Sequence, residues 1–121
     1  MQHIGVDIIE IVRIEEAVAN WEERFLNRIF TDAELKLCRR NPSSLAARFA
    51  SKEAVMKLLG TGAKGVSWKD IETLSHPSGK PFVNLHGRAK VIAEKLGLQG
   101  IAISLSHSRE YAIATAIGET V

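Results

Sequence analysis

The hydrophobic period changes along the chain, from two near the N-terminus to helical spacing in the middle and back to two near the C-terminus. Residues 3–12 (HIGVDIIEIV) are rich in β-branched side chains, which predicts a buried or half-buried strand. Residues 101–106 and 111–117 predict an antiparallel pair of strands around a turn at 107–110. Strands at both ends with helices clustered between them favour an α+β fold over the regular alternation of a doubly wound fold.

The middle of the chain predicts helices, one of them long and central. Apolar side chains recur at helical spacing over 13–29, and a capping-box pattern at 31–34 (TDAE) begins a short second helix. A break at 41–43 starts the long helix over 43–59, which ends at Gly60 because glycine readily takes the left-handed conformation of a helix cap. The elements predicted after it are a strand over 67–73, a turn over 77–81, a strand over 82–85 and a helix over 88–96.

Composition sets the class of protein. The 121 residues are 45% apolar and 25% charged, which is typical of one soluble globular domain, so we expect a single domain over 1–121. No run approaches the roughly 20 apolar residues that span a bilayer, and no signal core follows a basic start, so we expect a cytoplasmic protein without a membrane partner. A net charge of +2 argues against a nucleic-acid partner, and a single cysteine excludes an intrachain disulfide.

Three charged residues lie where an ordinary surface role does not explain them. Asp7 sits in the most apolar strand, where an unpaired carboxylate would cost several kcal/mol, so it needs either a structural partner or a hard metal ion such as Mg²⁺. Glu53 and Lys57 are spaced i, i+4 in the long helix. That spacing is typical of a surface ion pair, but both flank an apolar stripe beside short alanines, where they could also serve a metal and a phosphate together.

One histidine and one glycine-rich loop are further candidates. His107 stands where its strand leaves the sheet, and it is either structural or a donor to phosphate or a proton carrier. The loop at 60–65 (GTGAKG) matches G-x-G-x-x-G but follows a helix, whereas a dinucleotide fingerprint follows a strand, so the Rossmann interpretation is rejected. The loop either ends the helix or brings its amides to a ligand.

Four segments together resemble the holo-acyl-carrier-protein synthases, the small bacterial branch of the phosphopantetheinyl transferase family. They are 5–10 (GVDIIE) with Arg13, 48–54 (RFASKEA) with Lys57 and 60–62 (GTG), 79–81 (GKP), and 104–107 (SLSH). Their order and the chain length make the resemblance specific, and it covers essentially all 121 residues. It implies the α+β fold of that family and transfer of 4'-phosphopantetheine from coenzyme A to a serine of apo acyl carrier protein.

The resemblance assigns roles to the charged residues. Asp7 and Glu53 are implied as ligands of Mg²⁺, with Mn²⁺ as the alternative, completed by pyrophosphate oxygens of coenzyme A and by water. Glu53 would help to deprotonate the carrier serine, directly or through a metal-bound water, and Lys57 would stabilise charge on the phosphates. These three residues would then be the catalytic set, which agrees with the need of phosphoryl transfer for positioning and charge neutralisation.

Other residues would bind the coenzyme. The resemblance implies that His107 contacts its nucleotide end and that Arg48, Gly62 and Lys80 lie along it. The family also implies a homotrimer with active sites in clefts between subunits.

A basic first helix would dock the acidic carrier, through Arg13 and, beyond it, Arg24 and Arg28. Four glutamates are interspersed with these arginines, which departs from the family pattern: Glu15, Glu16, Glu22 and Glu23. Six residues of extended strand span about 20 Å, so Arg13 is expected to lie away from Asp7 unless the chain bends back. On this reasoning Arg13 would serve the carrier and not the coenzyme.

Two rival classes remain at this stage. A small nucleic-acid-binding domain would need clustered lysines or stacked aromatics, which a nearly balanced charge and 6% aromatic residues disfavour. A non-catalytic assembly protein would use Asp7, Glu53 and Lys57 as a buried ion network.

Overall fold

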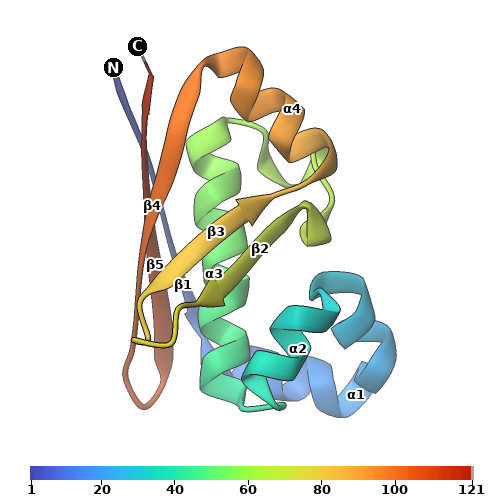
Figure 1. Ribbon diagram of the computed structural model, residues 1–121. Helices are drawn as coiled ribbons and strands as arrows, with labels where there is room; N and C mark the ends of the chain where they lie inside the picture. Colours follow the sequence, from blue (N-terminus) through green and yellow to red (C-terminus); the bar gives the residue numbers. More distant parts are fainter. Residues whose placement is uncertain (121) are drawn as a thin grey trace.

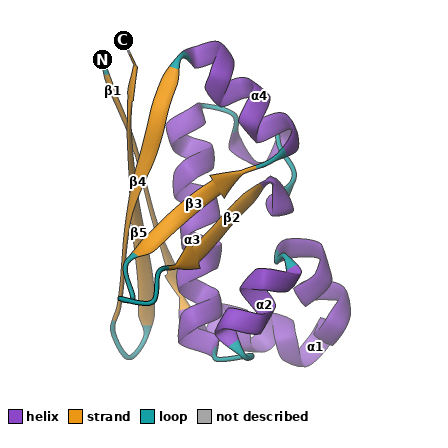
Figure 2. Ribbon diagram, in the orientation of Figure 1, coloured by secondary structure: helices purple, strands orange, loops and turns teal. Residues whose placement is uncertain are grey.

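A computed structural model describes residues 1–120, and its fold is α+β, as predicted (Figures 1 and 2). Five strands and four α-helices alternate irregularly. The strands are β1 (Gln2–Glu10), β2 (Ile71–Ser75), β3 (Pro81–Leu85), β4 (Leu98–His107) and β5 (Tyr111–Thr120). The helices are α1 (Ile11–Ile29), α2 (Asp32–Cys38), α3 (Pro42–Leu59) and α4 (Gly87–Leu96), with 3₁₀ turns η1 (Gly62–Lys64) and η2 (Trp68–Asp70).

The strands form two antiparallel sheets. Strand β5 lies between β1 and β4, while β2 and β3 form a separate hairpin. The register pairs Asp7 of β1 with Ala114 of β5 and pairs His107 of β4 with Ala112. The predicted pairing of the two C-terminal strands is therefore confirmed, and the first strand joins the same sheet.

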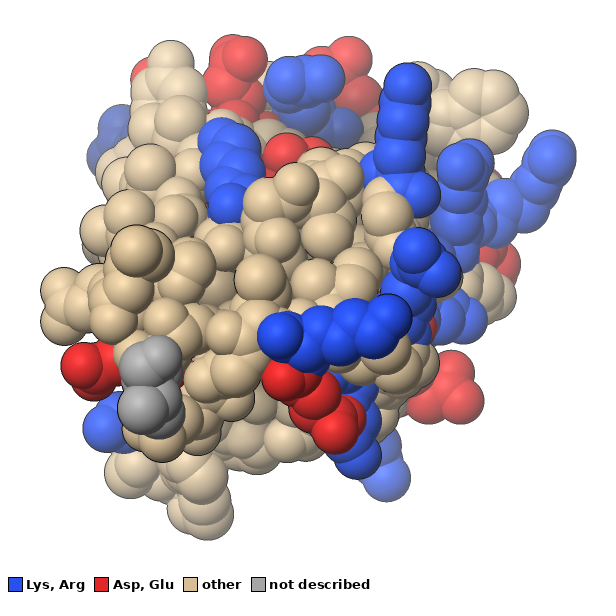
Figure 3. Space-filling model, turned by 90° about the horizontal axis from the view of Figure 1, so that it is seen from above, with Lys and Arg blue, Asp and Glu red and all other residues tan. Residues whose placement is uncertain are grey.

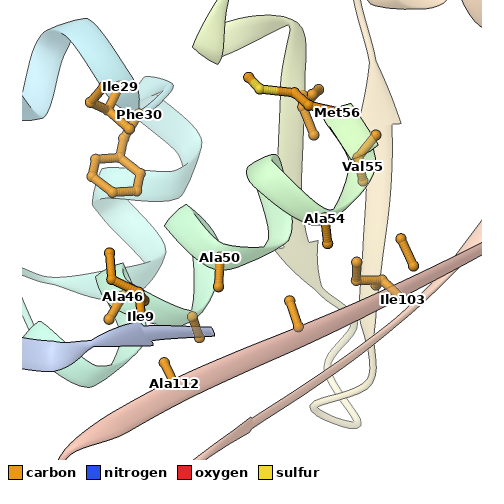
Figure 4. Close-up of a cluster of buried hydrophobic side chains, with 14 of the residues drawn as sticks. Ile9, Ile29, Phe30, Ala46, Ala50, Ala54, Val55, Met56, Ile103 and Ala112 are labelled. Carbon is orange, nitrogen blue, oxygen red and sulfur yellow. The ribbon is translucent and has the colours of Figure 1, made fainter. Parts of the chain in front are cut away.

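Helix α3 is the central element and lies between the two sheets (Figure 1). It begins where Asn41 accepts a hydrogen bond from the Ser44 N–H at 2.9 Å, and it ends at Gly60, whose φ of 76° is left-handed. Figure 4 shows Ala50 and Ala54 of α3 directed toward the strand that carries Ala112. Short side chains let the helix approach the three-stranded sheet closely, so these alanines are buried in the contact with the sheet.

The closest approach is at Gly5 of β1. A Cβ atom there would collide with the carbonyl oxygen of Ala54 and would lie 2.9 Å from the backbone nitrogen of Leu58. Both obstacles are helix backbone, which cannot rotate away as a side chain can. Gly5 therefore sets the distance between β1 and the C-terminal half of α3, which carries Lys57.

The elements extend or shift by a few residues relative to the prediction, and three of these differences have a clear local cause. Strand β1 ends at Glu10, because the Ile11 N–H bonds to the carbonyl of Glu110 at 2.8 Å and the chain turns directly into α1. Helix α1 is interrupted at Glu22, whose φ of 46° and ψ of −124° are not helical. The segment 68–70 is a 3₁₀ turn and not the start of a strand, since Asp70 folds back to bond Ser67.

One face of the three-stranded sheet is exposed and apolar. Ile4 pairs across the sheet with Ile117, and Ile8 with Ile113, and all four are exposed, Ile4 by 67%. The first strand is thus half-buried, with Asp7 on its inner side. In residues 1–120, no helix is long and apolar enough to cross a membrane.

Candidate active site

Asp7 and Lys57 meet between β1 and α3. The Lys57 ammonium donates to Asp7 Oδ1 at 3.2 Å and to the carbonyl oxygen of Val6 at 2.9 Å. The Asp7 side chain is only 14% exposed, while that of Lys57 is 55% exposed. Asp7 therefore has the partner that its position demanded, but the partner of Lys57 is Asp7 and not Glu53, one helical turn away.

Glu53 and Asp7 line one pocket, whose volume is about 290 Å³. Burial raises the pKa of the Glu53 carboxyl, and the charge of Asp7 raises that pKa further, while Lys57 and Arg13 partly offset the effect. Two carboxylates that repel each other across a pocket are suited to a shared cation. Within residues 1–120, no three His, Cys, Asp or Glu side chains cluster as a complete metal site, so these two carboxylates would need further oxygen ligands.

Arg13 lines this same pocket, which corrects the expectation that it lies away from Asp7. The error came from extending the strand as far as residue 12. Because β1 ends at Glu10 and α1 begins at once, the first turn of the helix brings Arg13 back beside the two carboxylates. Docking of the carrier by Arg13 stays a prediction, but the separation that motivated it is absent.

Arg24 and Arg28 line a neighbouring pocket on the second half of α1. Trp21 and Phe25 complete this pocket, and Trp21 is 57% exposed. Phe25 also lines the pocket of Asp7 and Glu53, so the two hollows adjoin. Trp21 is thus an exposed apolar side chain close to Arg24 and Arg28, although it falls within the helical repeat of apolar residues over 13–29.

Arg48 and His107 line a third pocket, between the N-terminal half of α3 and the end of β4. Arg48 is 91% buried and donates to Ser44 Oγ at 3.2 Å and to Ser75 Oγ at 2.8 Å, but its Nε has no protein partner. Cys38 lines the pocket as well, and burial raises the pKa of its thiol, which makes it unreactive. The structure thus brings together two residues that the sequence had linked only by family resemblance.

Gly62 and Lys80 lie apart from each other. Gly62 is in η1 beyond the C-terminal end of α3, about 20 Å along the helix from Arg48 at 1.5 Å per residue. Lys80 is exposed in the tight turn between β2 and β3, where His76 and Phe82 stack with ring centroids 4.3 Å apart. Figure 1 shows this turn at the same end of the molecule as the β4–β5 turn next to His107. A single chain therefore brings Lys80 toward His107 but leaves Gly62 at the other end of α3.

Residues 3–116 match the model of the 4'-phosphopantetheinyl transferase superfamily. The chain belongs to this superfamily. A holo-[acyl-carrier-protein] synthase of Dehalococcoides mccartyi is 56% identical over 119 residues, which are 98% of this chain and 99% of the relative. Another, of Chlamydia felis, is 51% identical over 121 residues, with 97% and 96% covered.

Solved structures of the superfamily share the fold of this chain. The crystal structure of Helicobacter pylori holo-[acyl-carrier-protein] synthase in complex with coenzyme A superposes with a TM-score of 0.88 at 35% identity, over 96% of this chain and 99% of that one. The synthase of Neisseria meningitidis gives a TM-score of 0.89 at 30% identity, with 98% of each chain covered. The predicted family and the predicted fold are both confirmed.

One polar feature of this transferase escaped the sequence analysis. Lys52 and Glu34 are both fully buried and form an ion pair at 2.7 Å between α3 and α2. The predicted capping box did place Glu34 at the start of α2, where Thr31 and Glu34 bond each other's backbone N–H. The only further signal was a lysine inside a strongly apolar helix, and its partner lies 18 residues away.

Proposed function

We propose that this chain transfers 4'-phosphopantetheine from coenzyme A to a serine of apo acyl carrier protein, giving holo carrier and adenosine 3',5'-bisphosphate. The observation that carries the proposal is similarity over nearly the whole chain to holo-[acyl-carrier-protein] synthases, at up to 56% identity. Solved relatives bind coenzyme A, among them the synthase of Helicobacter pylori. The enzyme class is therefore that of a phosphopantetheinyl transferase.

The reaction forms one phosphorus–oxygen bond and breaks another. The serine oxygen attacks the β-phosphate of coenzyme A, the pyrophosphate bridge breaks, and adenosine 3',5'-bisphosphate leaves with the bridging oxygen. Such transfers need little covalent help from the protein and depend on alignment of the reacting oxygens and neutralisation of phosphate charge. A pocket lined by two carboxylates and Arg13, with Lys57 bonded to Asp7 beside it, can supply both.

Asp7 and Glu53 have the donor chemistry of a magnesium site. Both are carboxylates in one pocket, and their mutual repulsion favours a cation between them. Mg²⁺, or Mn²⁺ as the alternative, would bind there and neutralise phosphate charge. Lys57, already beside Asp7, would carry a further positive charge to the phosphates.

Glu53 would accept the proton of the attacking serine. A carboxylate with a raised pKa is a stronger base than an ordinary one. Burial and Asp7 raise the pKa of Glu53 in this direction. Since the exposed Arg13 lines the same pocket, it can hold either the carrier or a phosphate beside this base.

The nucleotide end of the coenzyme would lie against Arg48 and His107. Arg48 offers a buried Nε without a protein partner, and a phosphate oxygen would satisfy it. Gly62 and Lys80 would lie along other parts of the coenzyme, as the family resemblance implies. The pocket of Arg48 and the pocket of Glu53 share no lining residue, which supports a site completed by a second subunit.

We infer a homotrimer, which is the assembly that the family resemblance implies. The exposed isoleucine pairs of the three-stranded sheet form an apolar surface that a second copy of the chain would cover. A subunit-mixing experiment tests this arrangement. Arg48→Ala and Glu53→Gln should each be inactive alone, whereas a 1:1 mixture of unfolded chains refolded together should regain about a quarter of wild-type sites if each site uses two subunits. No recovery would assign both residues to one chain.

The carrier would dock beside the active site, on Arg13, Arg24 and Arg28. The adjoining pockets and the exposed Trp21 between the arginines offer charge and apolar surface together. An acidic helix of the carrier could rest there while its serine enters the pocket of Glu53.

The rival interpretations gain no support. Figure 3 shows one end of the molecule, where Lys and Arg gather toward one side with acidic side chains beside them and most of the surface carries neither. Helix α4 carries exposed Arg88, Lys90 and Lys95 together with exposed Glu94, so its charges are mixed as well. We propose a single domain over residues 1–121, because α3 packs against both sheets. We also propose a cytoplasmic location.

A mass measurement tests the function. Incubation with coenzyme A, Mg²⁺ and an apo acyl carrier protein should raise the mass of the carrier by one phosphopantetheine. Chelation of the metal, Asp7→Ala or Glu53→Gln should abolish the increase while circular dichroism remains that of the wild type. Full activity after exhaustive chelation would contradict the magnesium site, and no increase with any acyl carrier protein would contradict the function itself.

A further inference from the structure

Helix α3 is joined to strand β2 by polar contacts that follow one another in register. They run in opposite directions along the two elements, as expected for a helix and a strand that pack antiparallel. The contacts are Arg48 Nη2 to Ser75 Oγ at 2.8 Å, Ser51 Oγ to Thr73 Oγ1 at 2.6 Å, and Lys52 Nζ to the carbonyl oxygen of Ile71 at 2.5 Å.

Lys52 and Glu34 form the centre of this contact. The Lys52 ammonium bonds Glu34 Oε1 at 2.7 Å and the carbonyl oxygen of Trp68 at 3.1 Å, and it lies 5.7 Å from the ring centroid of Phe30. Glu34 Oε2 accepts the N–H of Thr73 at 2.8 Å. The pair is thus bonded on all sides by α2, η2 and β2, and none of the steps of phosphopantetheine transfer uses it.

On the opposite side of α3, the polar contacts within residues 1–120 come from one side chain, Lys57, which bonds the carbonyl oxygen of Val6 and the carboxylate of Asp7 on β1; because this side chain is 55% exposed, those contacts are weaker than the buried ones to β2 and α2. There the helix meets the three-stranded sheet through fully buried alanines, which include Ala46, Ala50 and Ala54. Apolar contacts between short side chains are non-directional and hold a helix close without fixing its rotation. Hydrogen bonds fall off steeply with angle and distance, so the contacts to β2 and α2 set the rotation and height of α3.

Glu53 follows Lys52 directly, so the rotation of α3 determines the direction in which the Glu53 side chain points. A helix with side chains has a radius of about 5–6 Å, so a rotation by about 10° moves the end of a side chain by about 1 Å. A displacement of that size at a reacting group can cost about 10² in rate. Asp7, on β1, would stay in place while Glu53 moved.

We propose that Lys52, bonded to Glu34, is a positioning residue for phosphopantetheine transfer: it fixes the rotation of α3 so that Glu53 faces Asp7 across their shared pocket. The inference rests on the proposed roles of Asp7 and Glu53. Lys52 touches neither substrate nor metal, and its effect on the reaction passes through the orientation of the helix.

The test separates positioning from stability by removing the two charges first singly and then together. Lys52→Met alone leaves Glu34 buried and charged without a partner, so a large fall in the thermal unfolding midpoint is expected. Lys52→Met with Glu34→Gln removes both charges, and the glutamine keeps a carbonyl oxygen to accept the N–H of Thr73. The midpoint should recover most of that fall, because no unpaired charge is left buried, although the Thr31 N–H and the carbonyl oxygens of Trp68 and Ile71 each lose a partner.

The activity of the double variant decides between the two roles. If the pair positions Glu53, kcat stays about 10- to 100-fold below the wild-type value although most of the stability is restored, the KM for the carrier is unchanged, and more Mg²⁺ is needed for half-maximal rate. If the pair is only structural, kcat and the Mg²⁺ requirement return with stability, and the proposal is overturned. Lys69→Met, at an exposed lysine, is the matched control and should leave every quantity unchanged.

A milder variant covers the case in which the double variant does not fold. Ser51→Ala with Thr73→Val removes both partners of the neighbouring hydrogen bond without leaving a charge, and it should lower kcat several-fold with the carrier KM unchanged. Unchanged kcat in this variant would also overturn the proposal. Wild-type protein and Glu53→Gln are assayed in parallel. An active Glu53→Gln would contradict the proposed role of Glu53 but not the inference about the rotation of α3. Structures of the variants measure that rotation directly.

Discussion

Replacement of Lys57 by alanine should separate an exposed ion pair from a catalytic contact. The Lys57 side chain is 55% exposed and bonds Asp7 at 3.2 Å, and an exposed pair of this kind contributes well under about 1 kcal/mol to folding. We therefore expect the free energy of unfolding of Lys57→Ala to stay within about 1 kcal/mol of the wild type. The effect on the reaction should be far larger.

The size of that effect follows from charge and distance. Two unit charges about 4 Å apart interact by about 1 kcal/mol in water and by about 4 kcal/mol near a protein surface. If coenzyme A and the carrier bind as proposed, they would exclude water from the surroundings of Lys57 and strengthen its interaction with a phosphate toward about 4 kcal/mol. Since about 1.4 kcal/mol is tenfold in rate, we expect kcat to fall by about 10² to 10³.

A second quantity, the pKa of Glu53, checks the same reasoning. Lys57 lowers the pKa of Glu53, so its removal should raise that pKa above its already raised wild-type value. Glu53 acts as a base only when ionised, so the acid limb of the pH–rate profile should move to higher pH in Lys57→Ala. The carboxyl carbon resonance of Glu53, followed by NMR against pH without Mg²⁺, reports the direction. A kcat within threefold of the wild type and an unmoved resonance would refute the argument and leave Lys57 as a surface ion pair.

Three further substitutions test the geometry around the site. Gly5→Ala drives a Cβ into the backbone of α3 and should lower the free energy of unfolding, measured by denaturant titration, by at least about 2 kcal/mol. Transfer activity should fall as well, because β1 must move. Gly100→Ala is the control and should be nearly neutral, since nothing lies within 4 Å of a Cβ there. Glu22→Gly relieves a non-helical backbone with positive φ and should raise stability by about 1 kcal/mol, visible as a higher unfolding midpoint; a lower midpoint would mean that the kink is not strained. Arg13→Glu should raise the KM for the carrier and flatten the salt dependence of that KM. Because Arg13 lines the pocket of Glu53, the substitution should also lower kcat, and an unchanged kcat would leave Arg13 with a docking role alone.

The sequence predicted those features of the fold that depend on residues close together in the chain, such as helix ends and strands. The ends of α3 followed from Asn41 and Gly60, and the start of α2 followed from the Thr31–Glu34 capping box, because each feature involves residues at most a few positions apart. Period-two patterns predicted the sheet strands for the same reason. The side of β1 that faces α3 was not predictable, since both sides carry β-branched residues and only Gly5 marks the inner one.

Long-range contacts account for what the sequence analysis missed. The Lys52–Glu34 pair joins residues 18 positions apart, and no periodicity announces it. The proximity of Arg13 to Asp7 depended on where one strand ended, and a boundary error of two residues was enough to reverse that inference. The boundary itself depends on a hydrogen bond from Ile11 to Glu110, 99 residues away, which only the folded sheet provides.

The placement of α3 between two unlike surfaces explains how one helix can serve a reaction that depends on positioning. Arg48 and Glu53 are five positions apart, which is about 7.5 Å along the axis and about 140° around it. They therefore point to different sides of the helix, and a bound coenzyme could reach both within one chain only by passing around α3. A neighbouring subunit laid against the exposed isoleucines of the sheet could instead offer its own Arg48 beside this Glu53. The helix itself fixes the angle between the two residues, so it is the same in every subunit. On our proposal the contacts of Lys52 set where both residues point relative to β1, and each cleft between subunits would receive the same pair.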